Sequence, residues 1–251
     1  MMKVLTANCL LSHLSPKSHP IEVRFSRLLK QLVDTTILCG QETDTITQEL
    51  VSTRFPHYTL LAEPHHPNAI WYDQEMLSTL AYQTILLPNH ITGQQINTRI
   101  ARSLQVVTFL HHASNISFQL FHTHLSYGEP DLVKQQLNII DKHLQDADRS
   151  IDRIMVGDLN HEYHSDTLQH FFQQGFADTY QSIHHAFYKG PTYHAFKTDF
   201  TRLSKVDWIL LDGKHLQVID AQVLDQMPPP QCGSDHYFVQ ATLDFQGVGN
   251  G

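Results

Sequence analysis

Residues Ile154–Asn160 read Ile-Met-Val-Gly-Asp-Leu-Asn, an apolar run followed by a glycine, an aspartate and an asparagine. The first three residues have the composition of a buried strand. Asp158 and Asn160 are two positions apart, so their side chains lie on the same face if the chain stays extended. The segment therefore predicts a core strand that presents two polar side chains at its end.

Five other segments have the same layout, in which an apolar run ends in or abuts a polar residue. Strands of layered α/β folds end at a common rim, and ligands of such folds bind there. Because the six segments are spread over the full length, no local motif can unite their polar residues. We therefore expect the fold to gather them at one site. The five segments are Val4–Asn8, Ile37–Glu42, Phe121–Leu125, Lys205–Ile209 and Gly233–His236.

Strands and helices are predicted along the whole chain. Apolar residues recur at i, i+4, i+7 and i+11 from Val133, which predicts a helix with Pro130 near its first turn. Ser165 is a good N-cap for a second helix, and Gly175 suits its end. A third helix is predicted over Val23–Val33. Strands are predicted over Val4–Ala7, Thr36–Cys39, Val106–Leu110, Ile116–Phe121, Ile154–Val156, Val206–Leu211 and Tyr237–Leu243.

The chain shows no linker, repeat or low-complexity block that would divide it. The proline cluster at 228–230 is better explained by a rigid extended segment than by a domain boundary. Ser114-Asn115 predicts a hairpin turn between two of the strands. We therefore predict a single domain over residues 1–251, with α/β or α+β layers around more than one sheet.

Composition excludes several classes of protein. The 25 acidic and 17 basic side chains give a formal net charge of −8, which argues against sequence-independent binding to nucleic acid. No apolar stretch approaches the ~18 residues of a membrane span. The three cysteines lack CxxC spacing, so neither a disulfide framework nor a structural zinc site is predicted. The N-terminus lacks a signal-peptide apolar region, so we expect the cytoplasm by default; export by a signal-less route would leave the same N-terminus.

Histidine is unusually frequent, with 19 residues, so the surface potential is expected to respond to mild acid. Three histidine doublets lack the i,i+4 spacing that places two imidazoles on one helix face. We interpret these doublets as solvated loop residues rather than metal ligands: His65-His66, His111-His112 and His184-His185.

The polar residues at the six strand ends form an oxygen-rich set with two imidazoles. Oxygen ligands in small number suit Mg²⁺ or Mn²⁺, which keep several waters and bind substrate phosphate directly. The sequence has no HExxH zinc motif, no GxxxxGK[ST] phosphate loop and no GxSxG nucleophile elbow. The chemistry that fits is attack of water on a phosphate ester, assisted by a divalent metal.

The order of these motifs resembles that of the endonuclease/exonuclease/phosphatase superfamily, the metal-dependent phosphoesterases related to deoxyribonuclease I. Each motif is weak alone, but five occur in register over nearly the whole chain. The resemblance implies an α/β (α+β) fold, a four-layer α/β sandwich with two packed mixed β-sheets flanked by helices. The matching motifs are Thr6-Ala7-Asn8, Gln41-Glu42-Thr43, Thr123-His124-Leu125, Gly157-Asp158-Leu159-Asn160 and Ser234-Asp235-His236.

Further segments are similar to a mostly bacterial branch of that superfamily. Asn68–Tyr72 looks like a strand that carries an aromatic residue beside the phosphate. Gly190–Phe196 and the segment that begins at Lys205 look like the branch's T-F/Y-H-G-F and R-I-D-W/Y-I stretches. The chain departs from the branch in three places: Ala195 replaces the usual glycine, Lys205 the usual arginine, and the insert before Arg99 is shortened. The shortened insert removes part of a substrate-facing rim, so the branch does not predict the substrate.

The resemblance implies a metal ligand set and residues that handle water. Glu42 is then the principal metal ligand, and Asn8 and Asp235 support it. Asp158 is expected to orient or deprotonate the attacking water, and Asn160 to donate a hydrogen bond to a non-bridging phosphate oxygen. Taken alone, Glu42 would be a solvated acid after a strand, and Asp158 with Asn160 would be an Asx turn.

The resemblance also implies histidines at the phosphate. His236 is expected to lie against it, with Asp207 at the other ring nitrogen. A carboxylate partner favours the imidazolium, which would stabilise charge on the phosphoryl oxygens. Whether Asp158 or His236 takes the proton from water stays open. His124 is expected to contact the phosphate or the leaving oxygen; a lone histidine near an apolar strand is otherwise a satisfied core residue.

Substrate-side residues are also implied. They are Tyr72, Arg99 and His194, and Arg102 competes with Arg99 for the same role. A surface salt bridge is the alternative interpretation of either arginine.

Three functions are compatible with these residues. The first is an Mg²⁺- or Mn²⁺-dependent phosphoesterase that hydrolyses a phosphate mono- or diester of a small or medium phosphorylated substrate. The second is an endo- or exonuclease with the same site, which the net charge does not favour. The third is an inactive binding module, against which the intact strand-end residues argue. The sequence predicts neither the substrate nor the oligomeric state.

Overall fold

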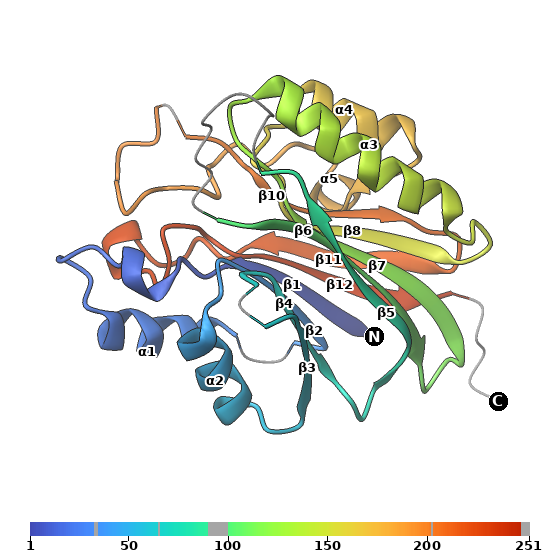
Figure 1. The fold of residues 1–251 in the computed structure, drawn as a ribbon, viewed down its shortest axis with the longest axis horizontal. Coiled ribbons are helices and arrows are strands. Elements are labelled where there is room, and N and C mark those ends of the chain that lie inside the picture. Colours follow the sequence, from blue (N-terminus) through green and yellow to red (C-terminus); the bar gives the residue numbers. More distant parts are fainter. Residues whose placement is uncertain (33–34, 65, 90–99, 202, 247–251) are drawn as a thin grey trace.

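The structure is a computed structural model that describes residues 1–32, 35–64, 66–89, 100–201 and 203–246. Within these residues, two six-stranded sheets pack face to face and helices cover both outer faces (Figure 1). This arrangement confirms the predicted four-layer α/β sandwich. None of the helices in the described ranges has the length and apolar character needed to cross a membrane.

The first sheet has the outer helices α1 (Ile21–Gln31) and α2 (Thr45–Arg54) packed against it. Strands β1 and β2 are parallel, and the other neighbours are antiparallel. The strand order is β11 (Leu216–Val223), β12 (Val239–Phe245), β1 (Met2–Asn8), β2 (Ile37–Gln41), β4 (Ala69–Asp73) and β3 (Tyr58–Ala62).

The second sheet is covered by α3 (Pro130–Asp146) and α4 (Asp166–Gln173). Among its described strands, β7 and β8 are parallel and the other neighbours are antiparallel. The strand order is β5 (Leu77–Leu87), β6 (Arg102–His111), β7 (Ile116–His124), β8 (Asp152–Asp158), β10 (Asp207–Asp212) and β9 (Ala177–Asp178). Three short helical segments complete the described elements: α5 (Thr179–His184), η1 (Ser12–Leu14) and η2 (Pro229–Gln231).

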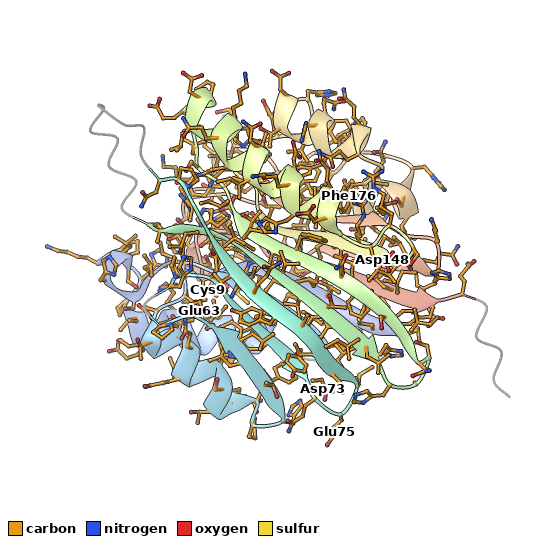
Figure 2. The ribbon with its side chains drawn as sticks, turned by 45° about the vertical axis from the view of Figure 1, so that its right-hand side comes forward. Cys9, Glu63, Asp73, Glu75, Asp148 and Phe176 are labelled. Atoms are coloured by element: carbon orange, nitrogen blue, oxygen red, sulfur yellow. The ribbon has the colours of Figure 1, made fainter. Side chains whose placement is uncertain are left out.

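The main hydrophobic core lies between the two sheets, and two further clusters lie under the helix layers. The three cysteines are free and buried, as expected for a chain without a disulfide framework. In Figure 2, Cys9 and Phe176 lie inside the molecule, whereas Glu75 lies at its periphery. The apolar runs of the sequence therefore meet in continuous packed layers.

The seven predicted strands and three predicted helices are all present, with boundaries shifted by a few residues. The Ser165 side chain accepts a hydrogen bond from the Leu168 amide at 3.3 Å, so it caps α4 as predicted. Asn115 adopts a left-handed conformation in the turn between β6 and β7. Sequence analysis missed β3, β5, β9, β11, α2 and α5, because these elements are short, are partly exposed or have weak apolar periodicity.

The histidines correct one prediction. His66 and His111 belong to the doublets interpreted as solvated, but both are buried, and burial lowers their pKa. His122 is completely buried between the sheets. Its Nδ1 lies 2.8 Å from Gln105 Oε1, which can only accept, so Nδ1 carries the hydrogen. Its Nε2 then accepts from the Gln41 amide at 2.7 Å, and the ring is held neutral.

This buried neutral imidazole predicts an acid-sensitive fold. Burial lowers the pKa of His122 to about 3, so the unfolded chain binds more protons than the folded one below pH 6.5. Stability present above pH 6.5 is lost as pH falls toward 3, and His122 alone contributes a loss of about 2 kcal/mol between pH 7 and pH 5. Urea unfolding at both pH values measures it. A folded His122→Gln variant should lose less stability over the same interval; an unchanged difference would contradict the assignment.

Candidate active site

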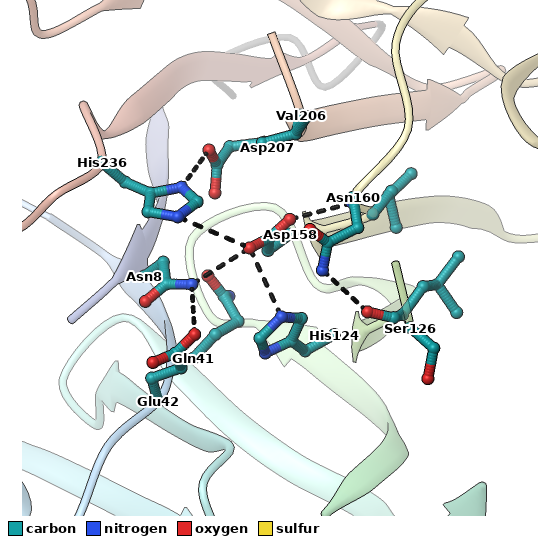
Figure 3. Close-up of polar contacts among 12 residues, drawn as sticks. Asn8, Gln41, Glu42, His124, Ser126, Asp158, Asn160, Val206, Asp207 and His236 are labelled. Atoms are coloured by element: carbon teal, nitrogen blue, oxygen red, sulfur yellow. Dashed lines mark hydrogen bonds and ion pairs between the residues drawn. The ribbon is translucent and has the colours of Figure 1, made fainter. Parts of the chain in front are cut away.

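The polar strand ends meet at one edge of the sandwich, around the carboxylate of Asp158 (Figure 3). Asp158 Oδ2 accepts a hydrogen bond from Asn8 Nδ2 at 3.0 Å. The same oxygen lies 3.4 Å from His124 Nε2 and 3.9 Å from His236 Nε2. Asp158 Oδ1 accepts from the Asn160 amide at 2.9 Å. The residues come from both sheets, so the fold gathers them as the strand-end pattern predicted.

A glycine allows β7 and β8 to approach closely at this point. Gly157 has φ of +140°, and a Cβ there would lie 1.9 Å from the Thr123 carbonyl oxygen. No other residue fits without moving the strands apart. In the resulting register His124 is directly opposite Asp158. The glycine of the Gly-Asp-Leu-Asn motif therefore sets the spacing between these two polar side chains.

Asn160 is held in a fixed orientation beside Asp158. Its backbone is left-handed, with φ of 54°, and its Nδ2 donates to the Leu125 carbonyl at 2.8 Å. An asparagine tolerates this conformation better than most residues. The side chain therefore lies at the rim of the site rather than in the core.

His236 forms a buried pair with Asp207, which lies opposite Asp158 in the register of β8 and β10. His236 Nδ1 lies 2.8 Å from Asp207 Oδ2. Burial opposes the charged ring, but the charge and hydrogen bond of Asp207, together with Asp158, raise the pKa of His236 to about 10. His236 is therefore an imidazolium at neutral pH, with Nε2–H directed toward Asp158.

The proton affinity of Asp158 is raised as well. Burial and the nearby charge of Asp207 raise the pKa of its carboxyl, although His236 and the hydrogen bond from Asn8 act in the opposite direction. A carboxylate with raised proton affinity is a better base than a solvated aspartate. Asp158 therefore has the environment of a functional group rather than of a surface acid.

The expected metal ligand Glu42 shares a hydrogen-bond donor, Asn8 Nδ2, with Asp158. Glu42 Oε1 accepts from Asn8 Nδ2 at 3.1 Å, and burial together with the charge of Asp235 raises the pKa of Glu42. Two adjacent carboxylates that repel one another fit a hard divalent cation. Asn8 Oδ1 accepts from the Leu10 amide at 3.1 Å, so Asn8 presents its amide nitrogen and would support Glu42 through a hydrogen bond.

A second group could also hold a cation. Donor atoms of Asp158, Asp207 and His236 all lie within 4.8 Å of one another. Two of the three residues already share the hydrogen bond between Asp207 and His236. Glu42 and Asp235 are not part of this group.

The structure does not bring Tyr72 to the site, which corrects its expected substrate-side position. Tyr72 is 7% exposed and belongs to the core between the sheets, with its ring centroid 5.1 Å from that of Phe109. It is opposite Ile37, at the end of β2 that is remote from Glu42. Because β4 runs antiparallel to β2, its first residues approach the site and Tyr72 does not.

Only one of the two candidate arginines belongs to the described residues. Arg99 lies outside the described residues. Arg102 is 8% exposed, and its Nε and Nη1 have no hydrogen-bond partner among the described residues. Burial lowers its pKa, while the charges of Asp158 and Glu42 act against that shift. Arg102 is therefore a buried cation close to the site, not a surface salt bridge.

His194 lies behind the site rather than on its open side. Its side chain is fully buried, its ring centroid is 4.4 Å from that of Tyr237, and burial lowers its pKa to about 3. Its backbone amide donates to the Asp235 carbonyl at 2.9 Å, so this segment positions Asp235. The next residue, Ala195, has φ of 50°, which explains why a glycine is usual there in the similar branch.

Sequence analysis missed two residues of the site. Tyr193 is 38% exposed, and its ring centroid lies 4.9 Å from that of His236. Ser234 Oγ donates to the Asn8 carbonyl at 2.5 Å and so joins the two segments that carry Asn8 and Asp235. Both residues belong to motifs that resemble those of the family. Tyr193 precedes His194 and Ser234 precedes Asp235, so their place beside predicted site residues could have indicated them.

Solved structures with the same fold cover almost the whole chain. An endonuclease/exonuclease/phosphatase from Bacteroides vulgatus matches with a TM-score of 0.81 and 16% identity, over 98% of this chain and 99% of that one. The mannosyl-6-phosphatase of Bacteroides thetaiotaomicron matches at 0.79 and 15%, over 98% and 100%. D. rerio TDP2, complexed with a single-strand DNA product, matches at 0.76 and 14%, over 97% and 98%.

Curated proteins gave no significant match. The model of the endonuclease/exonuclease/phosphatase family, in contrast, matches residues 5–236 and therefore includes all the strand-end motifs. Both the motif order and the fold agree with this match. The chain belongs to the endonuclease/exonuclease/phosphatase family.

Proposed function

We propose that the protein is a divalent-metal-dependent phosphoesterase. It hydrolyses a phosphate mono- or diester of a small or medium phosphorylated substrate by in-line attack of water. One observation supports the proposal: Asn8 Nδ2 at 3.0 Å, His124 Nε2 at 3.4 Å and His236 Nε2 at 3.9 Å surround a single oxygen of Asp158. Such a cluster of hydrogen-bond donors beside acidic metal ligands suits a phosphate oxyanion and an attacking water.

Asp158 is the proposed base. His236 is already protonated at neutral pH because Asp207 raises its pKa to about 10, so its ring cannot take the proton from water. Asp158, whose pKa is raised by burial, can. We therefore favour Asp158 over His236 as the residue that accepts the proton from water.

The other polar groups bind the phosphate. His236 Nε2–H and Asn160 Nδ2 donate hydrogen bonds to phosphoryl oxygens, and His124 contacts the phosphate or the leaving oxygen. Glu42 and Asp235 would hold the divalent cation. When bound, Mg²⁺ or Mn²⁺ would neutralise negative charge on the phosphate.

The substrate is more consistent with a small phosphorylated molecule than with nucleic acid. The net charge of −8 opposes approach of a polyanion. Among structures of this fold, one is a mannosyl-6-phosphatase and another holds a single-strand DNA product, so a nuclease is the second candidate. Activity that falls steeply with salt would favour the nuclease.

Release of p-nitrophenol from bis(p-nitrophenyl) phosphate and from p-nitrophenyl phosphate tests the proposal directly. We expect hydrolysis with Mg²⁺ or Mn²⁺ and none after treatment with EDTA. A panel of phosphorylated sugars, nucleotides, lipids and oligonucleotides then assigns the substrate class. Absence of metal-dependent hydrolysis on the whole panel would favour the inactive binding module.

Glu42→Gln should raise the Mg²⁺ concentration needed for half-maximal rate by at least about tenfold, because a neutral amide is a much weaker ligand than a carboxylate. A titration of initial rate against Mg²⁺ measures this. Glu49→Gln, which removes an exposed carboxylate from α2, is the matched control. An unchanged Mg²⁺ requirement in folded Glu42→Gln would contradict the ligand assignment.

A further inference from the structure

Arg24 is a completely buried arginine on α1, a helix that otherwise lies at the surface. Its exposed fraction is 0%, whereas Arg27, one turn further along, is partly exposed. Within the described residues, Arg24 takes part in no ion pair. A buried charge without a carboxylate partner is costly unless its donors are satisfied. The hydrogen-bond acceptors of this guanidinium therefore indicate the role of Arg24.

Four hydrogen bonds satisfy the guanidinium, and three of them end on backbone carbonyls. Nη1 donates to the carbonyls of Cys9 at 2.5 Å and Gly233 at 3.0 Å. Nη2 donates to the Leu10 carbonyl at 2.7 Å, and Nε to Ser15 Oγ at 3.0 Å. The planar fork thus holds three carbonyls of two chain segments that are more than 200 residues apart in the sequence.

The first of these segments fixes Asn8. Leu10 has a left-handed backbone, with φ of 54°, and its amide donates to Asn8 Oδ1 at 3.1 Å. That bond turns Asn8 Nδ2 toward Glu42 and Asp158. Because Arg24 holds the Leu10 carbonyl, it stabilises the turn that sets the orientation of the Asn8 amide.

The second segment carries Asp235 and His236. Gly233 precedes Ser234, whose Oγ donates to the Asn8 carbonyl and accepts from the His236 amide at 3.2 Å. A Cβ on Gly233 would lie 2.4 Å from the backbone nitrogen of Leu28, so α1 packs directly on this segment. The helix and its arginine therefore contact the segment immediately before the metal ligand.

The charge of Arg24 also faces the acidic residues. Asp235, Glu42 and Asp44 are the carboxylates whose attraction favours its charged form against burial. No cation among the described residues forms an ion pair with Glu42 or Asp235. A fixed positive charge behind these carboxylates reduces their mutual repulsion while no metal is bound.

We propose that Arg24 is a positioning residue for the metal centre: its guanidinium ties the Cys9–Leu10 turn to the Gly233 segment and so presets Asn8, Glu42 and Asp235 for a divalent cation. This inference rests on the proposed function, because it takes Glu42 and Asp235 as the metal ligands. The positions of the guanidinium N–H donors hold the two segments together, and a positive charge alone would not do so. A lysine cannot hold three carbonyls in this arrangement.

Binding of Mn²⁺ to the substrate-free protein tests the proposal. Arg24→Met removes charge and fork, and Arg24→Lys keeps the charge only. Free Mn²⁺ is measured by electron paramagnetic resonance at a temperature where circular dichroism shows each variant folded. We expect the Kd for Mn²⁺ to rise by about 10- to 100-fold in both variants. Arg27→Met, which removes a bond to the Pro230 carbonyl from the same helix, should keep the wild-type Kd.

A second variant covers the case in which Arg24→Met does not fold. Ser15→Ala removes only the Nε partner of Arg24 and should raise the Kd for Mn²⁺ less than Arg24→Lys does. Wild-type Mn²⁺ affinity in folded Arg24→Lys or Arg24→Met would overturn the inference, since a purely structural arginine changes stability alone. If the wild-type protein itself bound no Mn²⁺ and hydrolysed no ester, the proposed function would fail instead.

Discussion

Asp158→Asn is expected to lower kcat by about 10³-fold and to leave KM within about threefold of wild type. The substitution keeps the size of the side chain, but an amide oxygen is a far weaker base than a carboxylate. The new amide nitrogen could also face Asn8 Nδ2, which donates a hydrogen bond to Asp158 Oδ2, and the two donors would then oppose each other. Steady-state kinetics with bis(p-nitrophenyl) phosphate at saturating Mg²⁺ measure the effect.

The matched control is Asp212→Asn, at the other end of the same strand pair. Asp212 lies opposite Arg153 in the register that places Asp207 opposite Asp158, and it forms an ion pair with that arginine. Its loss should lower stability and leave the kcat of the folded protein unchanged. Near-wild-type turnover in folded Asp158→Asn would remove Asp158 from the reaction.

His236→Gln is expected to lower kcat by about 10²- to 10³-fold. Glutamine can still donate to Asp207, but it carries no positive charge toward the phosphoryl oxygens. Asp207→Asn should lower kcat less, because the His236 ring stays in place. Some loss is still expected, since the ring loses the carboxylate that raises its pKa. Both variants are compared by kcat at fixed pH and saturating metal.

A histidine–aspartate pair elsewhere on the protein provides the control. His170 Nε2 lies 2.8 Å from Asp141 Oδ1, the same separation as in the His236 and Asp207 pair, but it joins α4 to α3. His170→Gln should leave kcat unchanged. Equal losses in His170→Gln and His236→Gln would point to a general effect on folding rather than to a role at the phosphate.

The strand ends could be predicted from the sequence because in each of them an apolar run is followed by a polar residue. Asn8, Glu42, His124, Asp158 and His236 were all named in that way, and the structure places them at one rim. The Gly-Asp-Leu-Asn motif was the most informative, since Gly157 fits only where two strands come unusually close. The family match spans all of these residues.

Other positions could not be predicted, because they depend on which direction a strand runs. Tyr72 was expected near the phosphate, but β4 is antiparallel to β2 and carries it to the far end of the core. Periodicity along one segment contains no information on its neighbour. The role of Arg24 had no signal at all, since only the folded chain brings the Gly233 carbonyl to α1.

The site takes Asn8 and Glu42 from the end of one sheet, and His124, Asp158 and Asp207 from the end of the other. Neither half of the sandwich contains a complete set. The proposed hydrolysis therefore requires that the two halves have docked, so its rate would report on their mutual alignment. A sliding motion of one layer past the other would abolish this proposed activity well before the chain unfolds.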